Sequence, residues 1–350
     1  MGILAITLFD LRFRYRQFVI TVAGAALVFA MGLLLSGMAA GFSAEIDQTV
    51  RATSAQWWVL ASGSSARIGA LPVMPAKNVA AVAAEPGAAT AAPLVIGGQS
   101  ARIGTDERAL VLIGAVPGQL GSTDVSSGST IRRAGDAVVD GRLGVGIGRR
   151  ITIAGVGLTV VGTVSNRTMF AGQPDVYVSL RDAQRILFGG RPLINAVITT
   201  GKPGVVPRGL AAYSNEQIER ASLDQMSSAV SSISNTRIFM WSIAAFIVAA
   251  LVYVSTLERR RDFAVLKALG SSSGILFAGL VLQAVIVALT AAAIAAAIST
   301  FMTGLFAQRV EIPGSAFVVL PVIALAVGIL ASLVALRHAV GADPATAFAG

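Results

Sequence analysis

The sequence predicts an α-helical membrane protein with four transmembrane helices in a 1+3 arrangement and an extracytoplasmic α+β domain between helices 1 and 2. Three observations predict this class. The 350 residues are 55% hydrophobic and only 13% charged, whereas soluble domains carry about 25% charged residues. Uncharged apolar runs long enough to span a bilayer, about 20 residues, stand near both ends of the chain. A long glycine-rich region of alternating apolar segments separates these runs.

Residues 1–17 predict a cytoplasmic amphipathic helix on the membrane surface, because apolar residues recur at helical spacing and arginines follow them. The first span follows at 18–41 and is longer than the 7–15 apolar residues, roughly, of a signal-peptide core. A signal peptide cleaved near 40–44 stays open as the alternative. Gly37 and Gly41 form a G-x-x-x-G pair, which is typical of close helix packing.

Residues 42–213 predict the extracytoplasmic α+β domain, since short alternating segments are separated by turn dipeptides. Helices are expected at Pro75–Ala84 and Leu180–Phe188, each bounded by start and stop signals. The expected strands are Trp57–Leu60, Leu94–Gly98, Ala109–Val116, Ala137–Val139, Arg150–Ile153, Leu158–Val164, Val176–Ser179 and Ala196–Thr200.

The rest of the chain predicts a stalk helix and three further spans. In order these are the stalk at 214–236, a span at 237–257, a cytoplasmic loop at 258–273, a span at 274–307, an outer turn at 308–316, a span at 317–336 and a cytoplasmic tail at 337–350. Pro321 is expected near the outer end of the last span, where a missing amide donor costs least. Arginines at the inner span ends predict that both termini lie in the cytoplasm.

Composition and motifs exclude several classes of chemistry. The chain has no cysteine and one histidine, so no thiolate site or two-histidine site is expected. Gly201-Lys202 is followed by Pro203, which rules out a Walker A motif. The glycine-rich stretch 141–148 is interpreted as a turn, and Asp106-Glu107 as a solvated turn beside an arginine. We therefore predict no catalytic, cofactor-binding or metal-binding residues, and no nucleic-acid partner, since the membrane explains the charge of +9.

The loop Leu257–Ser273 carries most of the charge in the last third of the chain. As a helix it would place Phe263, Leu266 and either Leu269 or Gly270 on one apolar face. Gly270 can end this helix, and a serine of Ser271–Ser273 can cap the next one. The spans themselves carry no internal charge, so no ion or proton relay is expected in them. The loop is therefore the candidate point at which another protein supplies energy.

This loop resembles a known signature. Residues 258–270, ERRRDFAVLKALG, are similar to the ER-x-x-E/D-x-x-x-L-K-A-L/I-G motif of FtsX-like, MacB-type ABC transporter permeases. Asp343-Pro344-Ala345 in the last segment and residues 137–187 of the outer region also resemble that family, as does the 1+3 arrangement. The outer region looks smaller than that of MacB, so the DevC/HrtB-like branch is the closer match.

The resemblance implies a permease subunit, not an enzyme, that forms a homodimer in the lipid bilayer of the bacterial cytoplasmic (inner) membrane. It would bind a separate cytoplasmic ATPase subunit. ATP and Mg would be bound by that partner, with no cofactor on this chain. The implied ATPase-coupling residues are Glu258, Arg259, Asp262, Phe263, Leu266, Lys267 and Gly270. ATP hydrolysis would drive motion of the extracytoplasmic domain, for export or extraction of a hydrophobic or amphipathic substrate.

An alternative from another class is an FtsX-like signalling scaffold that regulates an extracytoplasmic cell-wall hydrolase. A membrane-bound enzyme with its site in the outer region is a third hypothesis, and the absence of cysteine and of a histidine there argues against it. The sequence leaves open the substrate, the choice between homodimer and heterodimer, and the identity of any extracytoplasmic adaptor or hydrolase.

Overall fold

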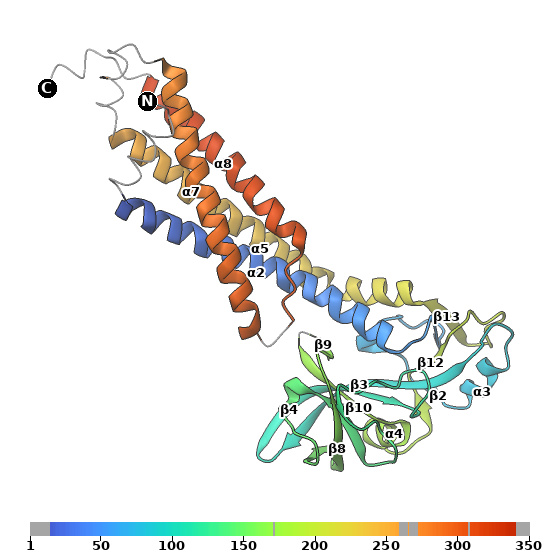
Figure 1. Cartoon of the computed structure of the whole chain (residues 1–350). Helices are drawn as coiled ribbons and strands as arrows, with labels where there is room; N and C mark the ends of the chain where they lie inside the picture. Colours follow the sequence, from blue (N-terminus) through green and yellow to red (C-terminus); the bar gives the residue numbers. More distant parts are fainter. Residues whose placement is uncertain (1–14, 171, 259–264, 266–271, 307–308, 341–350) are drawn as a thin grey trace. The chain divides into compact units, whose positions relative to one another are not determined.

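The computed structural model describes residues 15–170, 172–258, 265, 272–306 and 309–340. The chain divides into two compact units (Figure 1). We call Met1–Ala40, Val230–Phe306 and Val310–Gly350 the helical unit, and Gly41–Ala229 with Ala307–Arg309 the outer domain.

The helical unit is built from four long helices that pack around small side chains. They are α2 (Tyr15–Ala52), α5 (Asn215–Glu258), α7 (Ser273–Met302) and α8 (Gly314–Val340), with a 3-10 turn at Thr303–Leu305. Ala26, Ala244, Ala288 and Ala316, one from each helix, are buried in the same cluster. Small residues let helices approach closely in a membrane, so this core depends on van der Waals contact between helices.

Three helices in the described part of the chain are long and apolar enough to cross a membrane: Phe18–Ala52, Met226–Ala250 and Ala278–Leu305. In α8 a shorter apolar segment, Gly314–Ile323, is found among the described residues. The expected fourth span therefore stays a prediction.

The start of α7 agrees with the predicted serine cap, since the hydroxyl of Ser272 accepts a hydrogen bond from the amide of Ile275. Pro321 lies in the first half of α8, which begins at Gly314, near the end of the predicted span where it was expected. The missing amide donor of Pro321 therefore falls within the helix.

The first helix is longer than the span predicted at 18–41, because it continues to Ala52. Its last turns belong to the outer domain, where Ile46 and Val50, four residues apart, are buried among side chains of the sheet. Burial of this apolar stripe explains why the helix continues past Gly41, although Glu45 and Asp47 read as the start of a soluble region.

The outer domain contains one large mixed sheet. Its strands are β1 (Trp57–Ala61), β3 (Ala91–Ile103), β4 (Asp106–Ala115), β5 (Ser127–Gly128), β6 (Asp136–Asp140), β7 (Arg150–Ile153), β8 (Val156–Val164), β9 (Thr168–Met169), β10 (Gln173–Ser179), β12 (Ala196–Thr199) and β13 (Leu210–Ser214). A second sheet pairs β2 (Met74–Pro75) with β11 (Leu193–Ile194). Each predicted strand is present, whereas β13 and the short β2, β5, β9 and β11 were not predicted.

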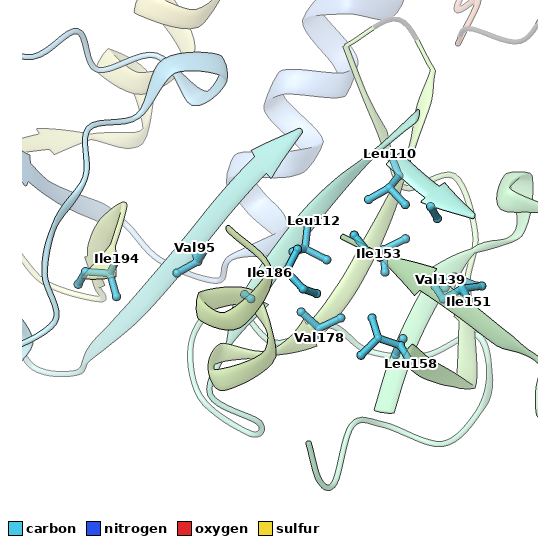
Figure 2. Packing of buried hydrophobic residues seen from close by; sticks show 14 of the residues in the cluster. Val95, Leu110, Leu112, Val139, Ile151, Ile153, Leu158, Val178, Ile186 and Ile194 are labelled. Atoms are coloured by element: carbon cyan, nitrogen blue, oxygen red, sulfur yellow. The ribbon is translucent and has the colours of Figure 1, made fainter. Parts of the chain in front are cut away.

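Part of this sheet closes on itself. β3 pairs with β4, β4 with β10, β10 with β6, β6 with β8, β8 with β7, and β7 returns to β3. Alternate residues of these strands form one hydrophobic cluster. Figure 2 shows Leu112, Val139, Ile153, Leu158 and Val178 lying together in this cluster. Ring closure removes exposed strand edges from this part of the domain.

Helix α4 (Leu180–Phe188) has the predicted bounds. The hydroxyl of Ser179 accepts a hydrogen bond from the amide of Asp182 and so caps the start of α4. Gly189, in the left-handed conformation, ends the helix. A side chain at Gly114 would overlap the Cβ of Ala183, so this glycine lets α4 lie close to β4. Helix α3 spans Asn78–Ala83 and not the predicted 75–84, because Pro75 is paired with Leu193 in β2.

The G-x-x-x-G pair contacts the connection between α7 and α8, not the helix that the pattern predicts. A Cβ on Gly37 would lie 2.6 Å from Cγ1 of Val310, and the carbonyl of Gly37 accepts a hydrogen bond from the amide of Glu311. A Cβ on Gly41 would overlap the carbonyl oxygen of Arg309. The two glycines thus hold an extended segment against the helix.

Candidate functional site

Only one of the predicted coupling residues falls in the described part of the chain. Glu258 is the last residue of α5 and is exposed. Val265, within the same loop, is helical and 53% exposed. The other coupling residues lie outside the described residues: Arg259, Asp262, Phe263, Leu266, Lys267 and Gly270. Their role stays a prediction.

A buried acidic group that the sequence did not predict lies where α2 meets the sheet of the outer domain. Glu45 of α2, Asp140 of β6 and Asp175 of β10 are each at most 2% exposed. Glu45 accepts a hydrogen bond of 2.9 Å from the hydroxyl of Thr168. Asp140 accepts hydrogen bonds from the amides of Arg142 and Arg167. We call Glu45, Asp140 and Asp175 the buried acids.

Asp175 has the weakest hydrogen bonding of the buried acids. Its Oδ2 accepts a long hydrogen bond of 3.4 Å from the hydroxyl of Tyr177, and its Oδ1 has no partner among the described residues. Burial raises the pKa of Asp175 to about 8, and the charge of Asp140 adds to this effect. Burial beside Asp175 also raises the pKa of the Tyr177 hydroxyl. Asp175 is therefore mostly protonated at neutral pH.

We expect the Asp175→Asn variant to gain stability relative to the wild type as the pH rises from 5 to 8. The folded protein keeps the proton of Asp175 up to a pKa of about 8, whereas the unfolded chain loses it near the ordinary pKa of 3.8. The wild-type stability should fall as the pH rises between these values. The neutral amide avoids this loss, which is on the order of 2–4 kcal/mol at most.

Thermal unfolding of the full chain in detergent from pH 5 to pH 9 would measure this difference. Asp106→Asn is the matched control, because Asp106 is exposed at the start of β4. Parallel pH profiles for wild type and Asp175→Asn would contradict a protonated Asp175.

Two of the hollows formed by described residues lie on the outer domain. One of about 600 Å³ is open and polar, and Ser100, Arg102, Glu107 and Thr152 line it. The other, of about 170 Å³, lies beside Tyr177. Within the described residues no group of His, Cys, Asp or Glu side chains is placed to hold a metal ion. The predicted turn at Asp106-Glu107 is wrong, because both residues belong to β4 and pair with β3, although their side chains are exposed. The stretch 141–148 begins with a 3-10 turn at Gly141–Leu143, and its Leu143 and Val145 are buried while its other residues are exposed.

Family models match both parts of the chain. The model of the MacB-like periplasmic core domain matches residues 18–213, and that of the FtsX-like permease C-terminal region matches residues 237–344. The first match alone covers more than half of the chain.

The chain belongs to the FtsX-like, MacB-type ABC transporter permeases.

Relatives of similar length support this assignment. An uncharacterized ABC transporter permease of Mycobacterium tuberculosis (strain H37Rv) is 34% identical over 342 residues, which is 97% of this permease and 98% of that protein. One of Mycobacterium bovis is 35% identical with the same coverage. The permease therefore has a MacB-like periplasmic domain between its N-terminal helix and its later helices. Among the described residues, the N-terminal helix and two of the later helices are long and apolar enough to cross a membrane. An ABC permease implies a partner ATPase subunit.

Two solved structures resemble part of the permease. The periplasmic region of MacB from Actinobacillus actinomycetemcomitans aligns with a TM-score of 0.37 at 9% identity, over 50% of the permease and 96% of that chain. The extracellular domain of the transporter YknZ from Gram-positive bacteria aligns with a TM-score of 0.32 at 13% identity, over 48% and 87%.

Sequence reasoning missed the buried acids of the permease and also Arg237 and Trp241 of α5. Asp175 follows Pro174 in a segment that reads as a turn entering a strand, and nothing local distinguishes a buried aspartate there from an exposed one. Arg237 could have been found, because it directly precedes the apolar run that begins at Ile238.

Proposed function

We propose that this permease couples ATP hydrolysis on a separate ATPase subunit to motion of its outer domain, and that this motion exports or extracts a hydrophobic or amphipathic substrate. The working unit is a dimer of permeases with ATP and Mg bound to the ATPase partners. An extracytoplasmic adaptor completes the machine if the substrate travels beyond the membrane.

The observation that carries this proposal is the continuity of α5. This single helix of 44 residues begins at Asn215 and ends at Glu258, the first residue of the predicted coupling loop. Near its start Ile218 is buried in the core of the outer domain, and further along Val248 is buried in the helical unit. An unbroken helix is a rigid element that can carry a displacement along its length.

The family of the chain also supports an external source of energy, because an ABC transporter permease implies a partner ATPase subunit. The sequence itself has no Walker A motif. The relatives are named as transporter permeases, which supports transport over the alternative of a signalling scaffold.

We expect Phe263→Asp and Leu266→Asp to abolish association with the ATPase. Each places a charge on the predicted apolar face of the coupling helix, where burial of an unpaired carboxylate opposes binding. A pull-down of the partner ATPase from membranes, with both subunits expressed together, would measure the loss, which should exceed about tenfold.

Val265→Asp is the matched control, because Val265 is helical, 53% exposed and on a different face from Leu266. The control should retain the ATPase. Equal recovery of the ATPase with all three variants, together with unchanged ATPase stimulation, would refute the coupling role of this loop.

A further inference from the structure

An arginine and a tryptophan of α5 face α2 within the helical unit. Arg237 and Trp241 lie one turn apart on α5, and Gly32 and Ser36 lie one turn apart on α2. A Cβ on Gly32 would lie 2.7 Å from Cδ1 of Trp241, so this glycine makes room for the indole. The guanidinium carbon of Arg237 lies 5.2 Å from the centroid of the Trp241 ring.

The polar atoms of this pair are poorly satisfied. Nη1 of Arg237 donates only a long hydrogen bond of 3.4 Å to the hydroxyl of Ser36. Nε of Arg237 and Nε1 of Trp241 are buried and have no hydrogen-bond partner among the described residues. None of the ion pairs between described residues includes Arg237. A charged group in an apolar segment with only one long hydrogen bond is costly, and such a residue marks a functional site by default.

The position of the pair along the helices suits a membrane interface. Ser36 precedes Gly37, and the carbonyl of Gly37 accepts a hydrogen bond from the amide of Glu311 in the connection between α7 and α8. The pair thus lies at the end of the helical unit where these helices are joined. Ile238 and Phe239, which follow Arg237, are 55% and 67% exposed. Tryptophan and arginine with apolar neighbours are typical of the level at which lipid head groups begin.

We propose that Arg237 and Trp241 bind the anionic head group, a phosphate or carboxylate, of an amphiphile at this end of the helical unit. The half-buried guanidinium supplies charge and N–H donors that match such a group. The exposed apolar side chains beside it offer a surface to the acyl chains. The inference rests on the proposed function, because it names an anionic amphiphile as the class of substrate. A bound membrane lipid would offer the same head-group chemistry.

The first experiment measures head-group preference without any ATPase. The full-length chain in neutral detergent is titrated with dioleoyl phosphatidylglycerol or with dioleoyl phosphatidylcholine, and bound lipid is counted by native mass spectrometry. We expect the wild type to prefer the anionic lipid and Arg237→Gln to lower this preference about tenfold, the value of one charge-assisted contact. Trp241→Phe, which keeps a ring but removes the N–H, should lower it less.

The matched control is Arg220→Gln. Arg220 lies on the same helix outside the apolar segment and is already paired with Glu216. This variant should keep the wild-type preference. An unchanged preference in Arg237→Gln, or an equal loss in Arg220→Gln, would overturn the proposal. Thermal stability in detergent alone shows whether each variant is folded.

A second arm separates a transported amphiphile from a membrane lipid. With the ATPase bound in nanodiscs, exchange of labelled phosphatidylglycerol from the chain is followed with and without ATP. Exchange accelerated by ATP assigns the site to substrate, and exchange independent of ATP assigns it to a bound lipid. Head-group preference tests the Arg237 site, and ATPase recovery in the Phe263→Asp pull-down tests the proposed function. Because these readouts are separate, either hypothesis can fail alone.

Discussion

Replacing Ser231 of α5 with proline should uncouple the outer domain from ATP while leaving the ATPase bound. Ser231 is exposed and lies in the interior of the helix. Proline removes one backbone hydrogen bond and clashes with the preceding turn, at a cost of about 3 kcal/mol or more, which is relieved by a kink. A kinked helix no longer carries a displacement from Glu258 to Ile218. The coupling loop itself is untouched, so pull-down of the ATPase should be unchanged.

The absence of cysteine from the chain makes the motion measurable. A single Ala221→Cys substitution places a thiol on α5, where Ala221 is partly buried against the core of the outer domain. With the ATPase present, ATP should change the labelling rate of this cysteine by several-fold. Adding Ser231→Pro should remove the effect of ATP, whereas adding Ser231→Ala should preserve it. A proline variant that responds to ATP like its alanine control would show that α5 does not transmit the motion.

The second large effect is expected from Gly41→Ala. The new methyl group would overlap the backbone carbonyl of Arg309, which cannot move away as a flexible side chain would. The side chain of Arg309 donates a hydrogen bond to that of Gln48, and the amide of Glu311 donates one to the carbonyl of Gly37. The connection is therefore held on both sides of Gly41. Separating these segments should destabilise the protein by about 1–3 kcal/mol, despite the better helix propensity of alanine.

Gly24→Ala is the control for this substitution, because Gly24 lies in the same helix and a Cβ there meets nothing within 4 Å. It should leave the protein unchanged or stabilise it by up to about 1 kcal/mol. Thermal unfolding of the full chain in detergent compares the two variants. If Gly41→Ala unfolds at the same temperature as Gly24→Ala, the close contact with Arg309 does not contribute to stability.

Local signals predicted those elements whose boundaries are encoded by neighbouring residues. Helix α4 has the predicted bounds because each end depends on one nearby residue. The Ser179 side chain caps its start, and Gly189 ends it in the left-handed conformation. Strand β13 was missed because Leu210–Ser214 is short and only half-buried, and its last residue also reads as a helix start. The extension of α2 to Ala52 was missed because it depends on burial against a sheet formed by distant residues.

The candidate sites divide in the same way. The coupling loop could be predicted from sequence because charge, a glycine stop and a family signature occur together in one segment, and its role stays a prediction. The buried acids could not, since Glu45, Asp140 and Asp175 come from separate elements that only the tertiary fold brings together. The family of the permease was therefore predictable, whereas the protonation of Asp175 required the packing around it.

The order of strands in the outer domain has a consequence for how the protein is made. The sheet begins with Trp57, yet β1 pairs with β12 and with β13, in which the partner of Trp57 is Ser214. Pairing across so long a stretch of chain is slow. During synthesis Trp58 and Leu60 of β1 stay without these strand partners until the chain has been made as far as β13. The sheet of the outer domain can therefore be completed only when the start of α5, which directly follows β13, is being made.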